Sequence, residues 1–241
     1  MIGLGALMNT AAIAAAGVAG SFIGKAFDEQ KQSALIMACG VSTLFIGIAG
    51  AMEGMLSLQN GALVGGRAML VVICLTLGAL IGESIGIEDG FERLGEWLRQ
   101  KSGNARDPRF VDAFVTASLT VCIGAMAIMG SIEDGIKGDF STLAVKSVLD
   151  FIIIVMMTAS MGKGCGFSAV PVLMVEGSIT LLSRLIAPVM TEAATANLSL
   201  VGSILIFCVG LNLVWGKRVR VANLLPAVVL AVIVEYLPLR L

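Results

Sequence analysis

The chain contains no histidine, and only 14% of its 241 residues are charged. Without an imidazole side chain, the Ser/His/Asp triad, general-base catalysis by histidine and most zinc sites are excluded. The five cysteines are odd in number and widely spaced within apolar runs, so they indicate small buried residues rather than disulfides or a metal site. Neither a phosphate-binding glycine loop nor a dinucleotide fingerprint occurs, and no cofactor or metal is predicted.

Charge of either sign is scarce and balanced, with 16 basic and 17 acidic residues and a net charge of -1, which gives no reason to expect a nucleic-acid partner. What the chain has instead is apolar surface: 57% of its residues are hydrophobic and the mean hydropathy is +0.96. These values are typical of an integral membrane protein. The first apolar stretch is too long for a signal peptide and lacks a basic start, so we interpret it as a membrane span.

Eight stretches are apolar and long enough to cross a hydrocarbon core of about 30 Å, which takes about 20 helical residues. They are Met1–Gly24, Ser33–Leu56, Gly61–Ile87, Phe110–Ile132, Thr142–Met161, Cys165–Val189, Ala194–Gly216 and Val219–Leu239. The third is long for a straight helix, and we expect glycines such as Gly86 to end it early or bend it. The sequence therefore predicts an all-α polytopic protein with about eight transmembrane helices in a single domain over residues 1–241.

One connection, residues 88–108, is long and rich in basic side chains. Loops rich in Lys and Arg that directly connect membrane spans tend to stay in the cytoplasm. This loop is therefore predicted to lie on the cytoplasmic side of a bacterial inner membrane, and both termini are then extracytoplasmic. Within the loop, Phe91, Leu94 and Leu98 recur at helical spacing opposite charged side chains. This pattern predicts an amphipathic helix at the membrane interface.

A weak internal repeat has a period of about eighty residues, which separates Gly50, Gly130 and Gly210. Repeated units, often inverted, are a common architecture of secondary transporters. Chance similarity among helices rich in glycine and alanine is the alternative. The units this period predicts are 1–77, 78–157 and 158–241.

Four ionisable side chains fall inside predicted spans, where a charge costs about 2.5 to 3.5 kcal/mol unless it is paired or hydrated. Lys146 and Asp150 are four residues apart on one helix face, which fits either a structural ion pair or part of a site. Asp150 and Glu176 lie near half depth and form a candidate proton or cation site. Arg67, about a third of the way along the third span, could neutralise one of them or bridge to a glutamate such as Glu53 instead.

Two further elements are uncharged. Asn9 could coordinate an ion or simply form hydrogen bonds between helices. The segment Gly162–Pro171, which includes Ser168, holds three glycines, a serine and a proline at the edge of a span. It is either a broken helix that lines a site or a short cytoplasmic turn before the sixth span.

Several stretches of the sequence resemble the YqgA/YdfK-like family of bacterial polytopic membrane proteins of unknown function. The stretches that carry the resemblance are Gly5–Asn9, Gly78–Trp97, Phe114–Gly135, Lys146–Asp150, Phe167–Pro171, Gly177–Thr180, Gly210–Leu213 and Arg220–Ala227. The resemblance implies an inner-membrane location and a transport role. It implies no catalytic residues and no substrate.

We therefore predict a small secondary transporter or ion-conducting protein rather than an enzyme, with the lipid bilayer and a small ion or metabolite as its partners. The predicted binding residues are Asp150, Glu176, Lys146, Arg67, Asn9 and Ser168. A membrane scaffold or sensor subunit is the first alternative. An intramembrane enzyme that uses Ser168 with Lys163, or the two carboxylates, is the second. The sequence leaves open whether the chain forms a homo-oligomer.

Overall fold

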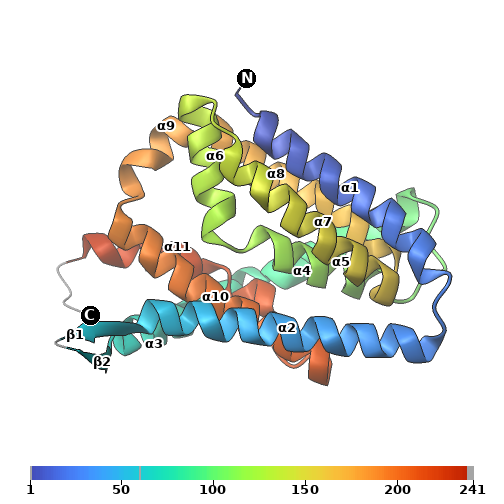
Figure 1. Cartoon of the computed structure of the whole chain (residues 1–241), viewed down its shortest axis with the longest axis horizontal. Helices are drawn as coiled ribbons and strands as arrows, with labels where there is room; N and C mark the ends of the chain where they lie inside the picture. The colour runs from blue at the N-terminus through green and yellow to red at the C-terminus, as the bar shows by residue number, and fades with distance from the viewer. Residues whose placement is uncertain (1, 60, 238–241) are drawn as a thin grey trace. The chain divides into compact units, whose positions relative to one another are not determined.

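The computed structural model of the chain describes residues 2–59 and 61–237 and is almost entirely helical (Figure 1). The α-helices are α1 (Leu4–Gly24), α2 (Glu29–Met55), α3 (Ala68–Ile85), α4 (Ile87–Lys101), α5 (Phe110–Cys122), α6 (Ala125–Lys137), α7 (Ser141–Met161), α8 (Ala169–Leu181), α9 (Ser183–Ile186), α10 (Glu192–Trp215) and α11 (Pro226–Ile233). Four 3-10 helices accompany them: η1 (Lys163–Ser168), η2 (Ala187–Val189), η3 (Val221–Leu224) and η4 (Val234–Tyr236). An antiparallel hairpin, β1 (Leu56–Gln59) and β2 (Ala62–Gly65), connects α2 to α3.

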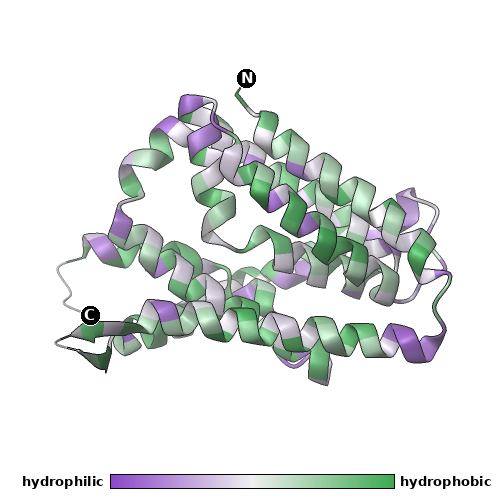
Figure 2. Cartoon of the chain, viewed as in Figure 1, coloured by the Kyte–Doolittle hydropathy of each residue, from purple (hydrophilic) through white to green (hydrophobic). Residues whose placement is uncertain are grey.

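The predicted fold class is confirmed, since six helices in the described residues are long and apolar enough to cross a membrane. They are α1, α2, α3, α7, α10 and the combined η1–α8. A seventh span results if α5 and α6, which are bent by 62° to one another, are counted together. Figure 2 shows hydrophobic residues along most of the length of these helices. The eighth predicted span holds only a shorter apolar helix, Val221–Tyr236, so the count of eight stays a prediction.

Two predicted spans differ from the observed helices. Residues 62–65 of the third span form strand β2, and α3 ends where Gly86 adopts a left-handed backbone with φ 69°, which shortens the helix at the glycine as expected. The fourth span is interrupted between α5 and α6 instead of running straight. The predicted ends at Met1 and Leu239 lie outside the described residues.

The helices group into two compact units, each described by itself below. Unit 1 comprises Met1–Cys39 and Asp89–Ala187, and unit 2 comprises Gly40–Glu88 and Pro188–Leu241. Unit 1 thus contains α1, the beginning of α2 and α4 to α9. Unit 2 contains the rest of α2, the hairpin, α3, α10 and α11.

In unit 1, α1 lies against α7 and η1 through a face of small residues. A Cβ atom added to Gly20 would lie 2.6 Å from the carbonyl oxygen of Val155, and one added to Gly24 would lie 2.8 Å from the carbonyl oxygen of Ala159. Such close approach of backbones is the usual means by which helices associate in lipid, where the hydrophobic effect does not drive them together. The position of α1 along α7 is therefore fixed by backbone contact.

In unit 2, α3 packs in a similar way against η3 and α11. A Cβ atom at Gly78 would lie 2.5 Å from the backbone nitrogen of Ala227, and one at Gly82 would overlap the carbonyl oxygen of Asn223. Both units also share an order of elements, because α7 and α10 each end at a glycine with positive φ and continue as a 3-10 helix and a short α-helix. The three repeat units predicted above are a separate division of the chain and stay a prediction.

The amphipathic helix predicted within the long connection is present as α4. Leu98 is buried, and Gly95 packs against the ring of Phe114 in α5, whereas Trp97 is exposed. The helix is confirmed, and its position at the membrane interface stays a prediction.

Candidate functional site

Four of the predicted site residues meet in the interior of unit 1. Asn9 extends from α1, Lys146 and Asp150 from α7, and Glu176 from α8. Their exposed fractions are 0%, 6%, 5% and 1%, respectively. We call these four residues the polar cluster. Asp150 is at the middle of the 21-residue α7, as predicted from the length of its apolar run.

Lys146 is the basic member of the polar cluster. Its ammonium forms a hydrogen-bonded ion pair with Oδ2 of Asp150, one helical turn away, as the spacing in the sequence predicted. Nζ also lies 3.7 Å from Oε1 of Glu176 and donates a hydrogen bond of 2.8 Å to the carbonyl oxygen of Val121. One lysine thus serves two carboxylates from two different helices.

The amide of Asn9 joins the two carboxylates. Its Nδ2 donates to Oδ2 of Asp150 at 3.0 Å and to Oε1 of Glu176 at 2.9 Å, so both of its N–H groups are used. Asn9 therefore does form hydrogen bonds between helices, one of the two interpretations left open by the sequence. Among the described residues, Oδ1 of Asn9 and Oε2 of Glu176 are buried and have no hydrogen-bond partner.

The Val121 carbonyl oxygen can accept the hydrogen bond from Lys146 because α5 ends close to this residue. α5 ends at Cys122, the backbone at Ile123 is extended, and α6 begins at Ala125. Carbonyl groups in the last turn of a helix have no partner within it. The interruption that sequence reasoning missed thus supplies the Lys146 ammonium with a backbone acceptor beside the two carboxylates.

A further buried acid of unit 1, Asp134, is not among the predicted site residues. It is fully buried in α6, where its two carboxylate oxygens accept hydrogen bonds from the backbone nitrogens of Gly3 at 3.2 Å and Gly5 at 3.0 Å. A carboxylate in this position accepts hydrogen bonds from N–H groups that have no partner within the helix. Its negative charge also interacts favourably with the positive end of the helix dipole. Asp134 therefore fixes the start of α1, a little more than one turn before Asn9.

The other acids of this region have different roles. Oε2 of Glu133 accepts a hydrogen bond of 2.7 Å from the Thr142 hydroxyl. Asp139 precedes α7 and accepts a bond of 3.0 Å from the backbone nitrogen of Ser141, which holds the pKa of this exposed carboxyl below its usual value. Both residues therefore stabilise the α6–α7 connection locally.

Two predicted site residues do not belong to the polar cluster. Ser168 is buried at the end of η1, and its hydroxyl donates a hydrogen bond of 2.7 Å to the carbonyl oxygen of Cys165. Arg67 belongs to unit 2 and precedes α3 with a left-handed backbone, rather than lying a third of the way along a span, because the residues before it form the hairpin. The Gly162–Pro171 segment is indeed irregular, since η1 interrupts the path from α7 to α8.

The charge of the polar cluster is unbalanced. With both carboxylates ionised and the lysine protonated, it carries one excess negative charge. Its surroundings are apolar, with Ile13, Ile154 and Val172 in the same fully buried core. Such a group can accept one further positive charge, either a proton on a carboxylate or a monovalent cation near the two unpartnered oxygens.

Comparison with known proteins gives a family and no activity. The chain is 27% identical over 232 residues to the "Uncharacterized protein YqgA" of Escherichia coli (strain K12), a match that covers 95% of this chain and 94% of that protein. It is 25% identical over 232 residues to the "Uncharacterized membrane protein YdfK" of Bacillus subtilis (strain 168), covering 96% and 95%, respectively. No solved structure matches the chain. The sequence pattern of one family matches residues 4–236, so the chain belongs to the family described as "Protein of unknown function (DUF554)".

Proposed function

We propose that this membrane protein is a secondary transporter or ion-conducting protein in which the polar cluster binds a proton or a monovalent cation. The observation that carries the proposal is the stoichiometry of the cluster, in which one lysine faces two buried carboxylates. A structural ion pair needs one acid for one base. The second acid adds a buried charge that helix packing does not require and that is costly within hydrocarbon.

The backbone around the polar cluster supports this proposal. The α5–α6 interruption supplies the Val121 carbonyl, and η1 breaks the path into α8, the helix that carries Glu176. Discontinuous helices beside intramembrane charges are a recurring feature of ion and substrate sites in transporters. In unit 1 both interruptions belong to helices that surround the cluster.

The proposed setting is the inner membrane of a bacterium, with both termini extracytoplasmic and residues 88–108 in the cytoplasm. The asymmetry of basic residues in the sequence supports this orientation. The proposed partners are the lipid bilayer and a small ion or metabolite. An enzymatic role is not part of the proposal, because the Ser168 hydroxyl is bonded to the Cys165 carbonyl rather than to Lys163.

A scaffold role is the competing proposal, and one observation favours it: the Asn9 amide ties α1, α7 and α8 together. In a scaffold, neutral side chains that preserve the hydrogen bonds would serve equally well. In a transporter, the charge itself is required. The two roles therefore differ in the effect of neutral isosteres.

The test uses the purified full chain in proteoliposomes with an imposed gradient of protons, sodium or potassium, and each preparation contains a dye selective for the ion under test. We expect a flux of at least one of these ions, lost in Glu176→Gln and in Asp150→Asn and retained in Glu192→Gln, an exposed residue of unit 2. The variants must keep the elution volume and helicity of the unmodified chain. Absence of flux for all three ions, or full flux in folded Glu176→Gln and Asp150→Asn, would refute the proposal and favour the scaffold.

A further inference from the structure

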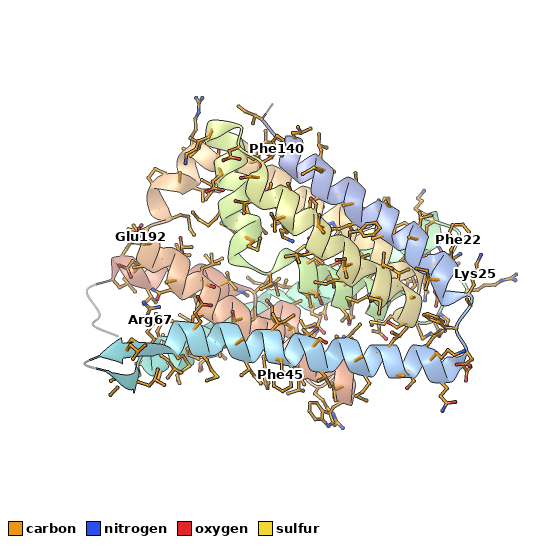
Figure 3. All side chains as sticks on the ribbon, viewed as in Figure 1. Phe22, Lys25, Phe45, Arg67, Phe140 and Glu192 are labelled. Atoms are coloured by element: carbon orange, nitrogen blue, oxygen red, sulfur yellow. The ribbon has the colours of Figure 1, made fainter. Side chains whose placement is uncertain are left out.

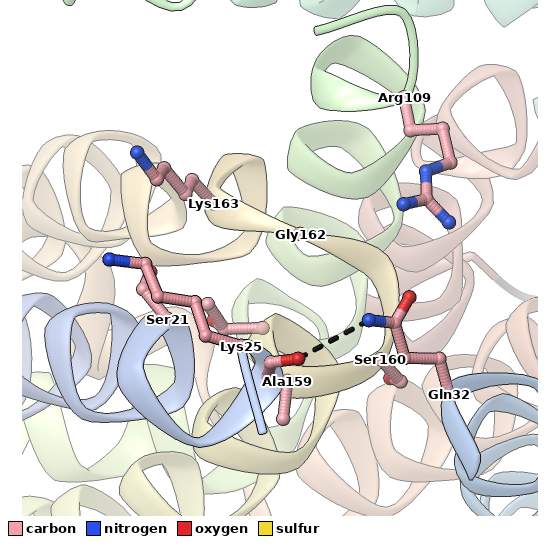
Figure 4. A pocket seen from close by; sticks show the side chains of 10 residues that line it. Ser21, Lys25, Gln32, Arg109, Ala159, Ser160, Gly162 and Lys163 are labelled. Carbon is pink, nitrogen blue, oxygen red and sulfur yellow. Dashed lines mark hydrogen bonds between the residues drawn. The ribbon is translucent and has the colours of Figure 1, made fainter. Parts of the chain in front are cut away.

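A second polar feature of unit 1 lies at the end where α1 and α7 terminate and where α2 and α5 begin. A pocket of about 240 Å³ is enclosed there by these four helix ends and by the start of η1 (Figure 4). Its lining residues are Ser21, Gly24, Lys25, Gln32, Arg109, Thr158, Ala159, Ser160, Gly162 and Lys163. We call this the basic pocket.

The lining of the basic pocket contains three cations and no carboxylate. Lys25, Arg109 and Lys163 come from three separate parts of the chain, and each is exposed. Within the described residues, none of the three forms an ion pair with a carboxylate within 4 Å. Figure 4 shows Lys25 and Lys163 extending to one side of Gly162 and Arg109 on the other. The charged side chains that line the pocket are therefore all cationic, and the carboxylate of Asp107 lies beside Gly162 at its edge.

The uncharged side chains of the lining contribute less to the pocket than the cations do. Most of the polar side chains there already donate to backbone carbonyls, as Gln32 does to Gly24 and Ser21 to Gly17. Thr158 differs, because its hydroxyl oxygen is buried without a hydrogen-bond partner in the described structure and the residue is only 2% exposed. Because less than 1 Å² of this oxygen is accessible, a ligand in the pocket does not reach it, and the three cations are the groups available for binding.

We propose that the basic pocket binds a phosphate group, supplied either by the head group of an anionic phospholipid or by free inorganic phosphate. A guanidinium and two ammonium groups around one cavity match the several acceptor oxygens of a phosphate. At the membrane surface each such cation contributes about 1 kcal/mol toward an anionic head group.

The place of the pocket on the chain suits both sources of phosphate. It lies where the apolar helix α1 ends, and Phe22 beside Lys25 is 67% exposed, so that an acyl chain would find apolar surface next to the cation (Figure 3). The Lys25 ammonium lies 5.4 Å from the centre of the Phe22 ring. A free phosphate would use the same cations without that surface.

This proposal does not depend on the transport function proposed above. Thr158 is eight residues beyond Asp150 on α7, which corresponds to about 12 Å along the helix. The residues that line the pocket are also not members of the polar cluster. Either site could fail its test while the other passes.

The test measures binding to the purified full chain in a neutral detergent by isothermal titration calorimetry, with three probes. They are inorganic phosphate, a short-chain phosphatidylglycerol and, as the zwitterionic control, a short-chain phosphatidylcholine. The variants are Lys163→Gln and Lys25→Gln, two exposed positions whose replacement leaves the core intact. Lys101→Gln, at the exposed end of α4 and outside the pocket, is the matched control.

We expect binding of inorganic phosphate or phosphatidylglycerol that is about fivefold weaker in each pocket variant and unchanged in the Lys101 variant, as the loss of about 1 kcal/mol implies. Binding of the lipid alone identifies the head group as the source, and binding of inorganic phosphate as well assigns the site to the phosphate itself. If neither anion binds, if phosphatidylcholine binds as tightly as phosphatidylglycerol, or if the pocket variants bind like the control, the proposal is wrong.

Discussion

The ammonium of Lys146 is the group whose removal should disturb unit 1 most, because it contacts every charged member of the polar cluster. Replacement by methionine keeps the length and the apolar stem of the side chain and deletes only the charge and its donors. Asp150 and Glu176 are then left with the Asn9 amide as their shared partner. The Val121 carbonyl loses its donor at the same time.

The expected loss of stability follows from these contacts. Removing one partner of a buried ion pair costs about 3 to 5 kcal/mol, because the remaining charge stays desolvated. Two unit charges at the 3.7 Å separation of Nζ and the Glu176 oxygen interact by about 4 kcal/mol at an effective dielectric constant of 20, which is of the same size. We therefore expect Lys146→Met to lower the free energy of unfolding by about 3 to 5 kcal/mol.

A double variant separates the charge from the shape of the side chain. Lys146→Met combined with Asp150→Asn removes one positive and one negative charge, so the cluster keeps the same excess negative charge as the unmodified protein. Part of the lost stability should return, because the Asp150 charge no longer lacks a partner, whereas the Glu176 carboxylate still does. Lys31→Met is the matched control, since Lys31 forms a 3.4 Å ion pair with Asp28 that is exposed and contributes at most about 1 kcal/mol.

The assay is reversible unfolding of the full chain in mixed micelles by a denaturing detergent, followed by far-ultraviolet circular dichroism. If Lys146→Met unfolds at the same detergent fraction as Lys31→Met, the polar cluster does not hold an ionised pair. If the double variant is as unstable as the single one, removing the Asp150 charge does not offset the loss of the ammonium, and the two charges are not coupled. Either result would contradict the charge count on which the proposed function is based.

Two further predictions concern the start of α1 and the orientation of the chain. Asp134→Asn should lower the stability by about 1 to 2 kcal/mol, because one acceptor and the negative charge at the start of α1 are lost. The exposed Asp139→Asn should leave the stability unchanged in the same unfolding assay, and equal effects of the two variants would show that the cap is not needed. A single cysteine at Gly103, in a chain cleared of its own cysteines, should resist an impermeant thiol reagent in intact cells and react after lysis, and labelling in intact cells would reverse the proposed orientation.

The helices could be predicted from the sequence because long apolar runs leave few alternatives in a membrane. The observed α7, Ser141–Met161, agrees within one residue with the predicted span, and α10 agrees within two. The break between α5 and α6 was missed because Gly124 is one glycine among 29, with nothing beside it to mark a turn. The β-hairpin did have a signal, since Asn60-Gly61 between apolar residues is typical of a two-residue turn.

The candidate site was predictable in its charged members and not in their geometry. The cost of charge inside a membrane singles out Lys146, Asp150 and Glu176 without any structure. A single sequence does not say which helices touch, so neither the role of Asn9 as a bridge nor the position of Arg67 between the hairpin and α3 could be inferred. Asp134 was missed for the same reason: it caps a helix 129 residues away in the chain.

These contacts make α1 the element through which the polar cluster would act under the proposed function. Its start is held by the Asp134 carboxylate, its side faces α7 through glycines such as Gly20, and its Asn9 amide donates to both carboxylates. A proton taken up at Oε1 of Glu176 would compete with that amide for the same oxygen, whereas a cation would bind at the unpartnered oxygens. The glycine contacts fix where α1 lies along α7, and the Asn9 hydrogen bonds act together with them. Uptake of one positive charge would thus be coupled to the position of a whole helix, which a solid ion pair of one acid and one base would not achieve.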